Sequence, residues 1–396
     1  MIVNASFKNF YSFGDEAEIS FEVGRKPSAS LYDINLTDGR RLNKVVAVLG
    51  ANGSGKTQFI KPLAFLGWFV SQSFLKSGPD SGIPLSPHLF NKNAPTEFEI
   101  HFLMKGNEYK YRLHIQDSRV LHESLHVKSK SSGYYSYLFS RDWTGSVYDY
   151  KQKGFGFNAA QAKQIRGNTS LIAAAYNYDV SAAADFVHYF MFITSNVKVS
   201  GRHDIDTNAV VESAEFFYKN KEFQSSMIEL MCQFDLGISD IQIKEASGQD
   251  ELGNAKTYYL PYGIHKEGMQ GFEMPFLEES SGTKSSFVLL RRLLPILKHG
   301  GTICLDEIDN DLHPHMLPLI LDLFKQDETN PFESQIIFTC HTAEMINHLR
   351  KHQIYLVEKD KQVSDAWRLD DVQGLRADDN LYAKYMAGAL SAVPNL

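Results

Sequence analysis

The sequence predicts an α/β fold built around a phosphate-binding loop, and three segments support this prediction. The apolar run 45–49 is followed at once by the glycine-rich segment 50–57. Two later apolar runs, 302–305 and 335–339, each end in polar residues that can take part in catalysis. Short apolar runs bounded by turn residues are typical of buried strands. A strand that feeds such a glycine-rich loop is typical of a nucleotide-binding domain.

The glycine-rich segment has the spacing G-x-x-x-x-G-K-[ST] and reads Gly50-Ala51-Asn52-Gly53-Ser54-Gly55-Lys56-Thr57. Glycines let the backbone N–H groups face the phosphates of a nucleoside triphosphate, and the loop ends at a helix N-terminus, where anions are favoured. We therefore expect Asn52, Gly53, Ser54 and Gly55 to contact the nucleotide. Lys56 is expected to reach the β- and γ-phosphates of ATP, and Thr57 to hold Mg²⁺.

The run 302–305 ends in two adjacent acids, Asp306 and Glu307. Taken by themselves, two carboxylates at a strand end are equally compatible with a solvated turn. In a nucleotide site, Asp306 would belong to the Mg²⁺ shell and Glu307 would polarise the water that attacks the γ-phosphate. The next run, 335–339, leads to His341, which we expect to sense the γ-phosphate. The order of these segments favours the catalytic interpretation.

The segment Glu278–Lys284 opens a helix expected over 285–297. A Ser-Ser-Gly sequence at a helix start is often only an N-cap and a flexible turn. Its position between the phosphate loop and the acidic strand resembles the signature motif of ABC ATPases, which is usually spelled leucine-serine-glycine-glycine-glutamine. The resemblance aligns Ser280 with the signature serine, and Ser281 and Gly282 with the two glycines.

This resemblance implies a particular fold and a particular dimer. The fold is that of an ABC-type P-loop ATPase head with an antiparallel β-subdomain and a compact helical insert. In ABC ATPases the start of the signature helix binds the nucleotide of the other subunit, where backbone N–H groups form an anion site. The chain is therefore expected to pair with itself in a head-to-tail ATP sandwich dimer, with a larger ring left open.

Both ends of the chain are similar to OLD-like, SMC-like ABC ATPases, many of which occur in bacterial phage-defence operons. The opening segment 2–13 resembles the "φ-x-N-F-x-S-F" segment that precedes their phosphate loop. Residues 307–314 are similar to the "DE-x-x-x-x-LHP" of OLD proteins, and 385–394 to the "Y-L-x-G-R-Y-G-A-V-P" tail of defence ATPases. The resemblance implies an ATPase and an antiviral, abortive-infection or PARIS-like role.

The chain also departs from these relatives. His313 stands where transporter-type ABC ATPases carry the aspartate of the D-loop, which disfavours transporter coupling. Ser281 replaces a signature glycine. The Q-loop glutamine of many relatives has no clear counterpart, because the candidates Gln161, Gln164 and Asn177 are equally compatible with surface positions.

The composition restricts the partners and the compartment. The net charge of −7 over 396 residues provides no general attraction to nucleic acid, so DNA or RNA contact would need local basic patches such as 105–112, 128–130 or 198–202. The three cysteines, Cys232, Cys304 and Cys340, show no disulfide pattern, which suits the reducing cytoplasm. No apolar run approaches about 18 residues, and Met1 leads into a strand-like pattern, so we expect neither membrane insertion nor secretion.

Four ranges are predicted along the chain: 1–78 as the N-terminal ATPase lobe, 79–157 as a β-rich subdomain, 158–270 as a helical insert or lid, and 271–396 as the C-terminal lobe. Alternation of apolar and polar residues predicts antiparallel strands between 97 and 150. The stretch 158–232 has no sustained heptads, which excludes a long coiled-coil arm. Its aromatic segment 186–192 is compatible with core packing or with partner docking.

These features predict an ATP-hydrolysing subunit that dimerises around ATP and controls a separate effector. OLD proteins carry a Toprim nuclease after the ATPase, and we expect no room for one here. The effector is therefore expected to be a nuclease or toxin encoded nearby in an antiphage system. Two alternatives remain: a RecF-type DNA-repair ATPase that clamps DNA, and a binding module whose ATP site is structural.

Overall fold

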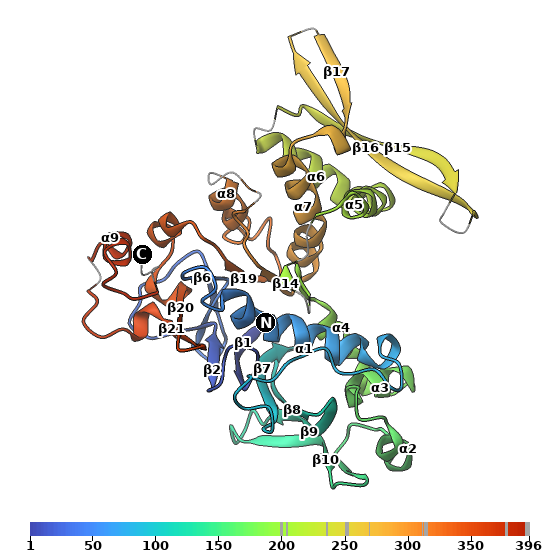
Figure 1. Cartoon of the computed structure of the whole chain (residues 1–396), viewed down its shortest axis with the longest axis vertical. Coiled ribbons are helices and arrows are strands. Elements are labelled where there is room, and N and C mark those ends of the chain that lie inside the picture. The colour runs from blue at the N-terminus through green and yellow to red at the C-terminus, as the bar shows by residue number, and fades with distance from the viewer. Residues whose placement is uncertain are drawn as a thin grey trace. The chain divides into compact units, whose positions relative to one another are not determined.

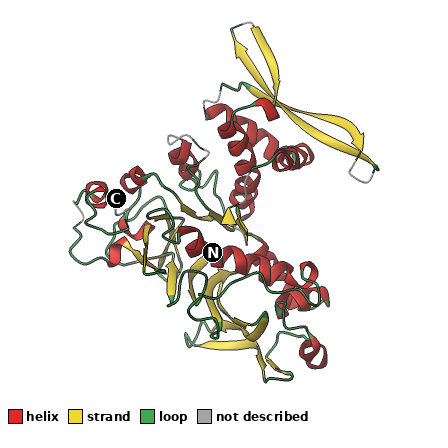
Figure 2. Ribbon diagram, in the orientation of Figure 1, coloured by secondary structure: helices red, strands yellow, loops and turns green. Residues whose placement is uncertain are grey.

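The computed structural model describes residues 1–198, 201–202, 205–234, 237–249, 253–268, 270–310, 312, 316–376 and 379–392. These residues form two compact units, shown along the chain in Figure 1 and by secondary structure in Figure 2. Unit 1 comprises Met1–Arg202, Gly301–Glu307 and Glu333–Leu396, and unit 2 comprises His203–Gly300 and Ile308–Phe332. The D-loop position His313 and the end of the tail motif, Val393 and Pro394, lie outside the described residues.

The central sheet of unit 1 confirms the predicted α/β fold. In the described part of the chain it has six strands in the order β12-β18-β19-β6-β20-β21. Neighbouring strands are parallel except β20 and β21, which are antiparallel. The strands are β12 Ile193–Ser195, β18 Thr302–Leu305, β19 Gln335–Thr339, β6 Val45–Leu49, β20 Ile354–Asp360 and β21 Val363–Arg368.

The strands β6, β18 and β19 are buried along their whole length. Parallel strands that are covered on both faces need continuous apolar runs, which explains the sequence pattern of these three segments. The pairing sets Val45 beside Ile336 and Thr302 beside Gln335. Because the three strands run in one direction, the residues that follow them meet at one edge of the sheet.

The second sheet of unit 1 is antiparallel, as predicted. Across the fully described range 1–152 it has seven strands in the order β11-β10-β9-β8-β7-β1-β2. Strand β7 alternates buried and half-buried side chains, because one face of the sheet packs on the core. The strands are β1 Ile2–Lys8, β2 Ala17–Ser20, β7 Thr96–Met104, β8 Asn107–Gln116, β9 Arg119–Lys128, β10 Tyr135–Trp143 and β11 Tyr148–Gln152. Three short strands, β3 Glu22–Val23, β4 Asp33–Asn35 and β5 Arg41–Asn43, form a small sheet of their own.

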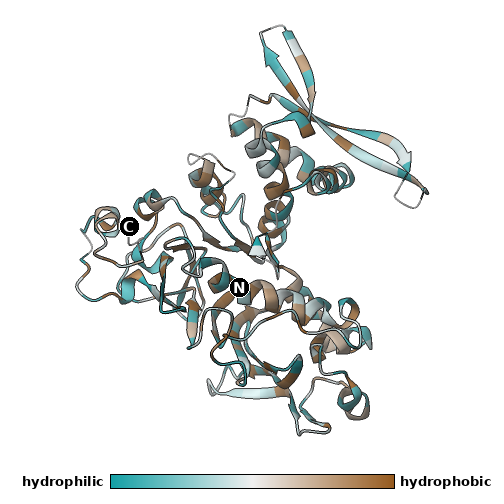
Figure 3. Ribbon diagram, in the orientation of Figure 1, coloured by the Kyte–Doolittle hydropathy of each residue, from teal (hydrophilic) through white to brown (hydrophobic). Residues whose placement is uncertain are grey.

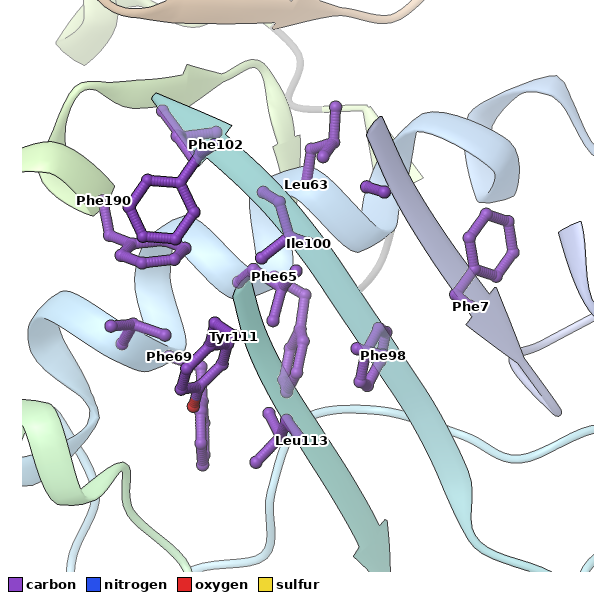
Figure 4. Packing of buried hydrophobic residues seen from close by; sticks show 14 of the residues in the cluster. Phe7, Leu63, Phe65, Phe69, Phe98, Ile100, Phe102, Tyr111, Leu113 and Phe190 are labelled. Carbon is purple, nitrogen blue, oxygen red and sulfur yellow. The ribbon is translucent and has the colours of Figure 1, made fainter. Parts of the chain in front are cut away.

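The core of unit 1 lies between the antiparallel sheet and three helices. Helix α1 (Lys56–Lys76) follows the phosphate loop, is apolar along much of its length (Figure 3), and packs with α3 (Leu171–Asn177) and α4 (Ser181–Met191). Figure 4 shows Phe65 of α1 against Phe98 of β7, with ring centroids 5.1 Å apart. Phe186 and Phe190 of α4 are buried in the same cluster, so the aromatic segment 186–192 contributes to the core. Helix α2 (Ala159–Gln164) packs on β11.

A buried ion pair joins the antiparallel sheet to α3. Glu123 of β9 and Arg141 of β10 are both fully buried, with Arg141 Nη2 2.8 Å from Glu123 Oε2. The same carboxylate accepts hydrogen bonds from the Tyr111 hydroxyl, the Ser170 hydroxyl and the Leu171 N–H at the start of α3. Glu123 therefore neutralises the buried charge of Arg141 and fixes the start of α3.

Replacing Glu123 with Ala is expected to lower the free energy of unfolding by about 3–5 kcal/mol, because it leaves the Arg141 charge buried without its carboxylate. Chemical denaturation of the purified chain measures the change. Glu99→Ala is the matched control, since the Glu99–Arg112 pair is partly exposed on the same sheet and contributes about 0–1 kcal/mol. An equal loss in the two variants would contradict this account.

Unit 2 contains a helical layer and a separate three-stranded antiparallel sheet. Helices α5 (Thr207–Lys219), α6 (Lys221–Gln233) and α7 (Ser281–His299) pack together, with the rings of Phe217 and Phe287 5.2 Å apart. Strand β16 pairs with both β15 and β17. In the described part of the unit, the strands are β15 Asp240–Gln249, β16 Ala255–Glu267 and β17 Gln270–Pro275, and a further α-helix is α8 Met316–Asp322.

The range 158–270, predicted as a helical insert or lid, contains the helices α2 to α6, but β12 and the strands β15 and β16 lie there as well. The run 255–267 contains three tyrosines and one threonine, which favour strands. In β15 the alternation of apolar and polar residues is weak, because both faces of this strand are largely exposed. The limits of the four predicted ranges remain a prediction about domains. Among the described residues, no helix is long and apolar enough to cross a membrane.

Candidate nucleotide-binding site

The phosphate loop connects β6 to α1, and its glycines allow close contact with the neighbouring strands. Gly55 forms the N-cap of α1 with φ of 112°, in the region that favours glycine. A Cβ on Gly55 would lie 2.5 Å from the Ser364 hydroxyl, and a Cβ on Gly50 would lie 2.2 Å from the Val357 carbonyl oxygen. Any larger residue at these positions would push the loop away from β20 and β21.

Two serines outside the loop hold its backbone in place. The Ser364 hydroxyl donates to the Ser54 carbonyl oxygen at 2.6 Å, and lies 2.7 Å from the Ser12 hydroxyl. Because a carbonyl oxygen only accepts, the Ser12 hydroxyl is the donor to Ser364. The Ser12 N–H donates to Gln58 Oε1 of α1 at 3.0 Å. The N-terminal segment that resembles OLD-like proteins therefore supports the phosphate loop, and Ser364 is a supporting residue that sequence reasoning missed.

Lys56 and Ser54 are both buried at the loop. The Lys56 ammonium donates to the carbonyl oxygens of Gly50 at 2.9 Å and Ala51 at 3.1 Å. The buried Ser54 hydroxyl makes no hydrogen bond with the described residues. A hydroxyl without a partner and an ammonium at the N-terminus of α1 are groups that phosphate oxygens can bind, so these residues fit a nucleotide. Asn52 and Gly53 lie exposed at the tip of the loop.

Asp306, at the end of β18, accepts hydrogen bonds at both carboxylate oxygens. The Thr57 hydroxyl donates to Oδ2 at 2.8 Å, and the Thr339 hydroxyl donates to Oδ1 at 2.7 Å. Burial raises the pKa of the Asp306 carboxyl above its usual range, while these two hydrogen bonds oppose the shift. A threonine hydroxyl beside a carboxylate is an oxygen donor set of the kind Mg²⁺ prefers, so Thr57 and Asp306 fit this cation.

An asparagine from the neighbouring strand fixes the backbone at Asp306. Asn196, directly after β12, accepts from the Asp306 N–H at 2.7 Å and donates to the Asp306 carbonyl oxygen at 3.0 Å. Sequence reasoning missed this residue, since its signal is only a polar residue after a short apolar run.

The three Q-loop candidates lie on helices of unit 1. Gln161 and Gln164 are exposed on α2, and the Asn177 side chain donates a hydrogen bond to the Ala173 carbonyl oxygen within α3.

The structure brings Glu307 and His341 together, as the sequence order predicted. His341 Nε2 lies 3.3 Å from Glu307 Oε1, and both side chains are about one-third exposed. The Glu307 N–H donates to the Thr339 hydroxyl at 2.7 Å, and the residue has a positive φ of 48°. The other carboxylate oxygen, Oε2, lies 3.6 Å from Nη1 of Arg202. Thr339 therefore contacts both acids of the pair.

The signature-like segment belongs to unit 2, at the start of α7. Ser280 is the N-cap of this helix, and its hydroxyl accepts from the Thr283 N–H at 3.1 Å. Ser280 and Ser281 are exposed, and Gly282 is half-buried. The capping interpretation of Ser280 is thus confirmed, while a role in binding ATP stays a prediction.

Three solved structures are similar to this chain. A structure of an SMC head bound to the C-winged helix domain of ScpA is 16% identical with a TM-score of 0.50, covering 93% of this chain and 97% of that chain. An SMC head from Thermotoga maritima is 14% identical with a TM-score of 0.43, covering 93% and 98%. An SMC head with an extended coiled coil, bound to the C-terminal domain of ScpA derived from Pyrococcus furiosus, is 14% identical with a TM-score of 0.45, covering 98% and 99%.

The first of these structures, with a TM-score of 0.50 at 16% identity, supports the fold and nothing more. No curated protein sequence matches the chain significantly. A family model described as "AAA domain, putative AbiEii toxin, Type IV TA system" matches residues 45–347, which include the phosphate loop, the acidic strand and His341. The chain therefore belongs to this family of AAA domains.

Proposed function

We propose that this chain binds ATP with Mg²⁺, hydrolyses it as a dimer, and thereby controls a separate effector in a bacterial antiphage system. The observation that carries the catalytic part is the convergence of three pairs at one edge of the central sheet. These pairs are Lys56 with the loop carbonyls, Thr57 with Asp306, and Glu307 with His341.

Binding would use the groups that the phosphate loop holds in place. Lys56 would exchange its two carbonyl partners for oxygens of the β- and γ-phosphates, and Ser54 would donate its hydroxyl. The backbone of 52–55 would supply N–H groups at the start of α1. Thr57 and Asp306 would hold Mg²⁺, which neutralises charge on the phosphates.

Hydrolysis would depend on Glu307. Its carboxylate would take the proton of a water molecule whose oxygen forms a bond to the γ-phosphorus. The bond between the γ-phosphorus and the β,γ-bridging oxygen breaks, which leaves ADP and phosphate. His341 contacts one oxygen of Glu307 and would orient that carboxylate while facing the γ-phosphate.

A second subunit would complete the site. Ser280, Ser281 and Gly282 start α7, where exposed N–H groups of a helix N-terminus suit a phosphate. We assign these residues to the γ-phosphate held by the loop of a partner copy, in a head-to-tail sandwich. The support is the exposure of Ser280 and Ser281 and the resemblance to the ABC signature.

The proposed role in defence is supported by the family of the chain and not by the geometry of the site. The family description names a toxin and a type IV toxin–antitoxin system, which agrees with the similarity of both chain ends to defence ATPases. We propose a nuclease or toxin encoded nearby as the effector.

One experiment with two arms tests the two parts of this proposal, which are ATP hydrolysis and the control of a separate effector. In the first, the purified chain is incubated with ATP and Mg²⁺, and phosphate release is measured. Hydrolysis is expected for the wild type, with a loss of about 100-fold or more in Lys56→Ala. Lys76→Ala, an exposed lysine at the other end of α1, is the matched control and should keep the wild-type rate. Equal rates in all three proteins would contradict the assignment.

In the second arm, bacteria express the chain with its neighbouring gene and are challenged with phage. Resistance is expected for the pair and should disappear with Lys56→Ala or without the neighbour. Resistance from the chain by itself would contradict a separate effector. A nuclease activity of the purified chain that is lost on mutating its own carboxylates would contradict it as well.

A further inference from the structure

Arg202 lies at the point where the chain leaves unit 1. It is the last residue of unit 1 before the segment that belongs to unit 2, and Glu307 is the last residue of unit 1 before the chain returns to unit 2. The side chains of these two residues face each other, with Arg202 Nη1 3.6 Å from Glu307 Oε2. Arg202 is 19% exposed and Glu307 is 32% exposed, so the pair is only partly open to solvent.

The chain between Asn196 and Arg202 is attached to the acidic pair at both of its ends. Asn196 makes two hydrogen bonds with the backbone of Asp306. Strand β13 (Val197–Lys198) then pairs antiparallel with β14 (Gly201–Arg202), which sets Arg202 opposite Val197. This short hairpin returns the guanidinium to the acidic strand only six residues after Asn196 leaves it.

The carboxylate of Glu307 is therefore held from two sides. The Thr339 hydroxyl fixes its backbone N–H, His341 contacts Oε1 and Arg202 faces Oε2. A general base must point at its water within a few tenths of an ångström, and such orientation depends on the neighbours of the side chain. Without Arg202, the Oε2 side of the carboxylate loses the cation that faces it, so the orientation of the carboxylate is less restricted.

We propose that Arg202 is a positioning residue for Glu307, and that the pairing of β13 with β14 holds its guanidinium beside this carboxylate. The inference rests on the proposed function, because it gives Glu307 the part of base in ATP hydrolysis.

The test compares four purified full-length proteins: wild type, Arg202→Gln, Arg202→Lys and the control Lys198→Gln. Lys198 is an exposed cation on the paired strand β13. Lys198→Gln therefore removes one positive charge, as Arg202→Gln does, but leaves the contact between Arg202 and Glu307 in place. Arg202→Gln is expected to lower kcat about 10–100-fold while KM and the Kd for ATP stay within about 2-fold. Arg202→Lys should recover part of kcat, and Lys198→Gln should match the wild type.

A double-mutant cycle separates positioning from a general effect on the fold. In single-turnover measurements, Arg202→Gln should cause no further loss in a Glu307→Gln background, because the group it orients is already gone. Three results would each overturn the inference. They are an equal loss of hydrolysis rate in both backgrounds, a wild-type kcat in Arg202→Gln, and a loss of ATP binding in Arg202→Gln and Arg202→Lys. Absence of hydrolysis by the wild type would overturn the proposed function together with it, whereas a normal wild type with an unaffected Arg202→Gln overturns the inference by itself.

Discussion

Glu307→Gln is expected to bind ATP normally and to hydrolyse it about 10²–10⁴-fold more slowly than the wild type. Glutamine keeps the size of the side chain and can still contact His341, but it cannot accept the proton of the attacking water. The nucleotide should therefore stay intact in the site. The accumulated species should be an ATP-bound dimer, because the step that would release the two subunits does not occur.

Phosphate release and size-exclusion chromatography with ATP measure the two effects. Glu344→Gln is a suitable control, because Glu344 is an exposed carboxylate three residues beyond His341 that contacts Tyr382. This variant should behave like the wild type in both measurements. A wild-type rate of hydrolysis in Glu307→Gln would show that Glu307 is not the base.

Ser280→Arg is expected to abolish ATP-dependent dimerisation and hydrolysis while the monomer still binds ATP. The arginine places bulk and charge at the exposed start of α7, where the proposed sandwich holds the γ-phosphate of the partner subunit. The phosphate loop of the same chain keeps Lys56 and its contacts. Ser280→Ala controls for the lost N-cap, which by itself costs about 1 kcal/mol of stability. It should retain dimerisation.

Two mixed dimers distinguish a composite site from a site within one chain. A purified one-to-one dimer of Ser280→Arg with Lys56→Ala holds one intact composite site and should recover part of the hydrolysis. A dimer of wild type with the double variant holds none and should be inactive. The opposite pattern, activity only in the second dimer, would contradict the sandwich.

The candidate site residues that could be predicted are those whose signal is local in the sequence. The phosphate loop could be recognised because its glycines, Lys56 and Thr57 are consecutive, and β6, β18 and β19 because buried parallel strands need continuous apolar runs. The order of Asp306, Glu307 and His341 along the chain then located the edge of the sheet where they meet.

The supporting residues could not be predicted in the same way. Asn196, Arg202, Thr339 and Ser364 lie in no recognisable motif, and each acts on a residue that is near only after the sheet has formed. The strands of unit 2 were missed for a different reason. Side chains on both faces of β15 are largely exposed, so its sequence lacks the contrast between faces that identifies a half-buried strand.

The contact between Ser364 and the phosphate loop has a consequence for biosynthesis. Its hydroxyl supports the Ser54 carbonyl across 310 positions of sequence, and β6 pairs with β19 and β20, which are also made much later. Contacts of such long range form slowly and must wait for the distant partner. On the ribosome, the loop at 50–57 emerges early but lacks its neighbouring strands until nearly the whole chain has been translated. The proposed ability to hold ATP should thus be among the last properties that the nascent chain acquires, and chains interrupted before β21 are expected to lack it.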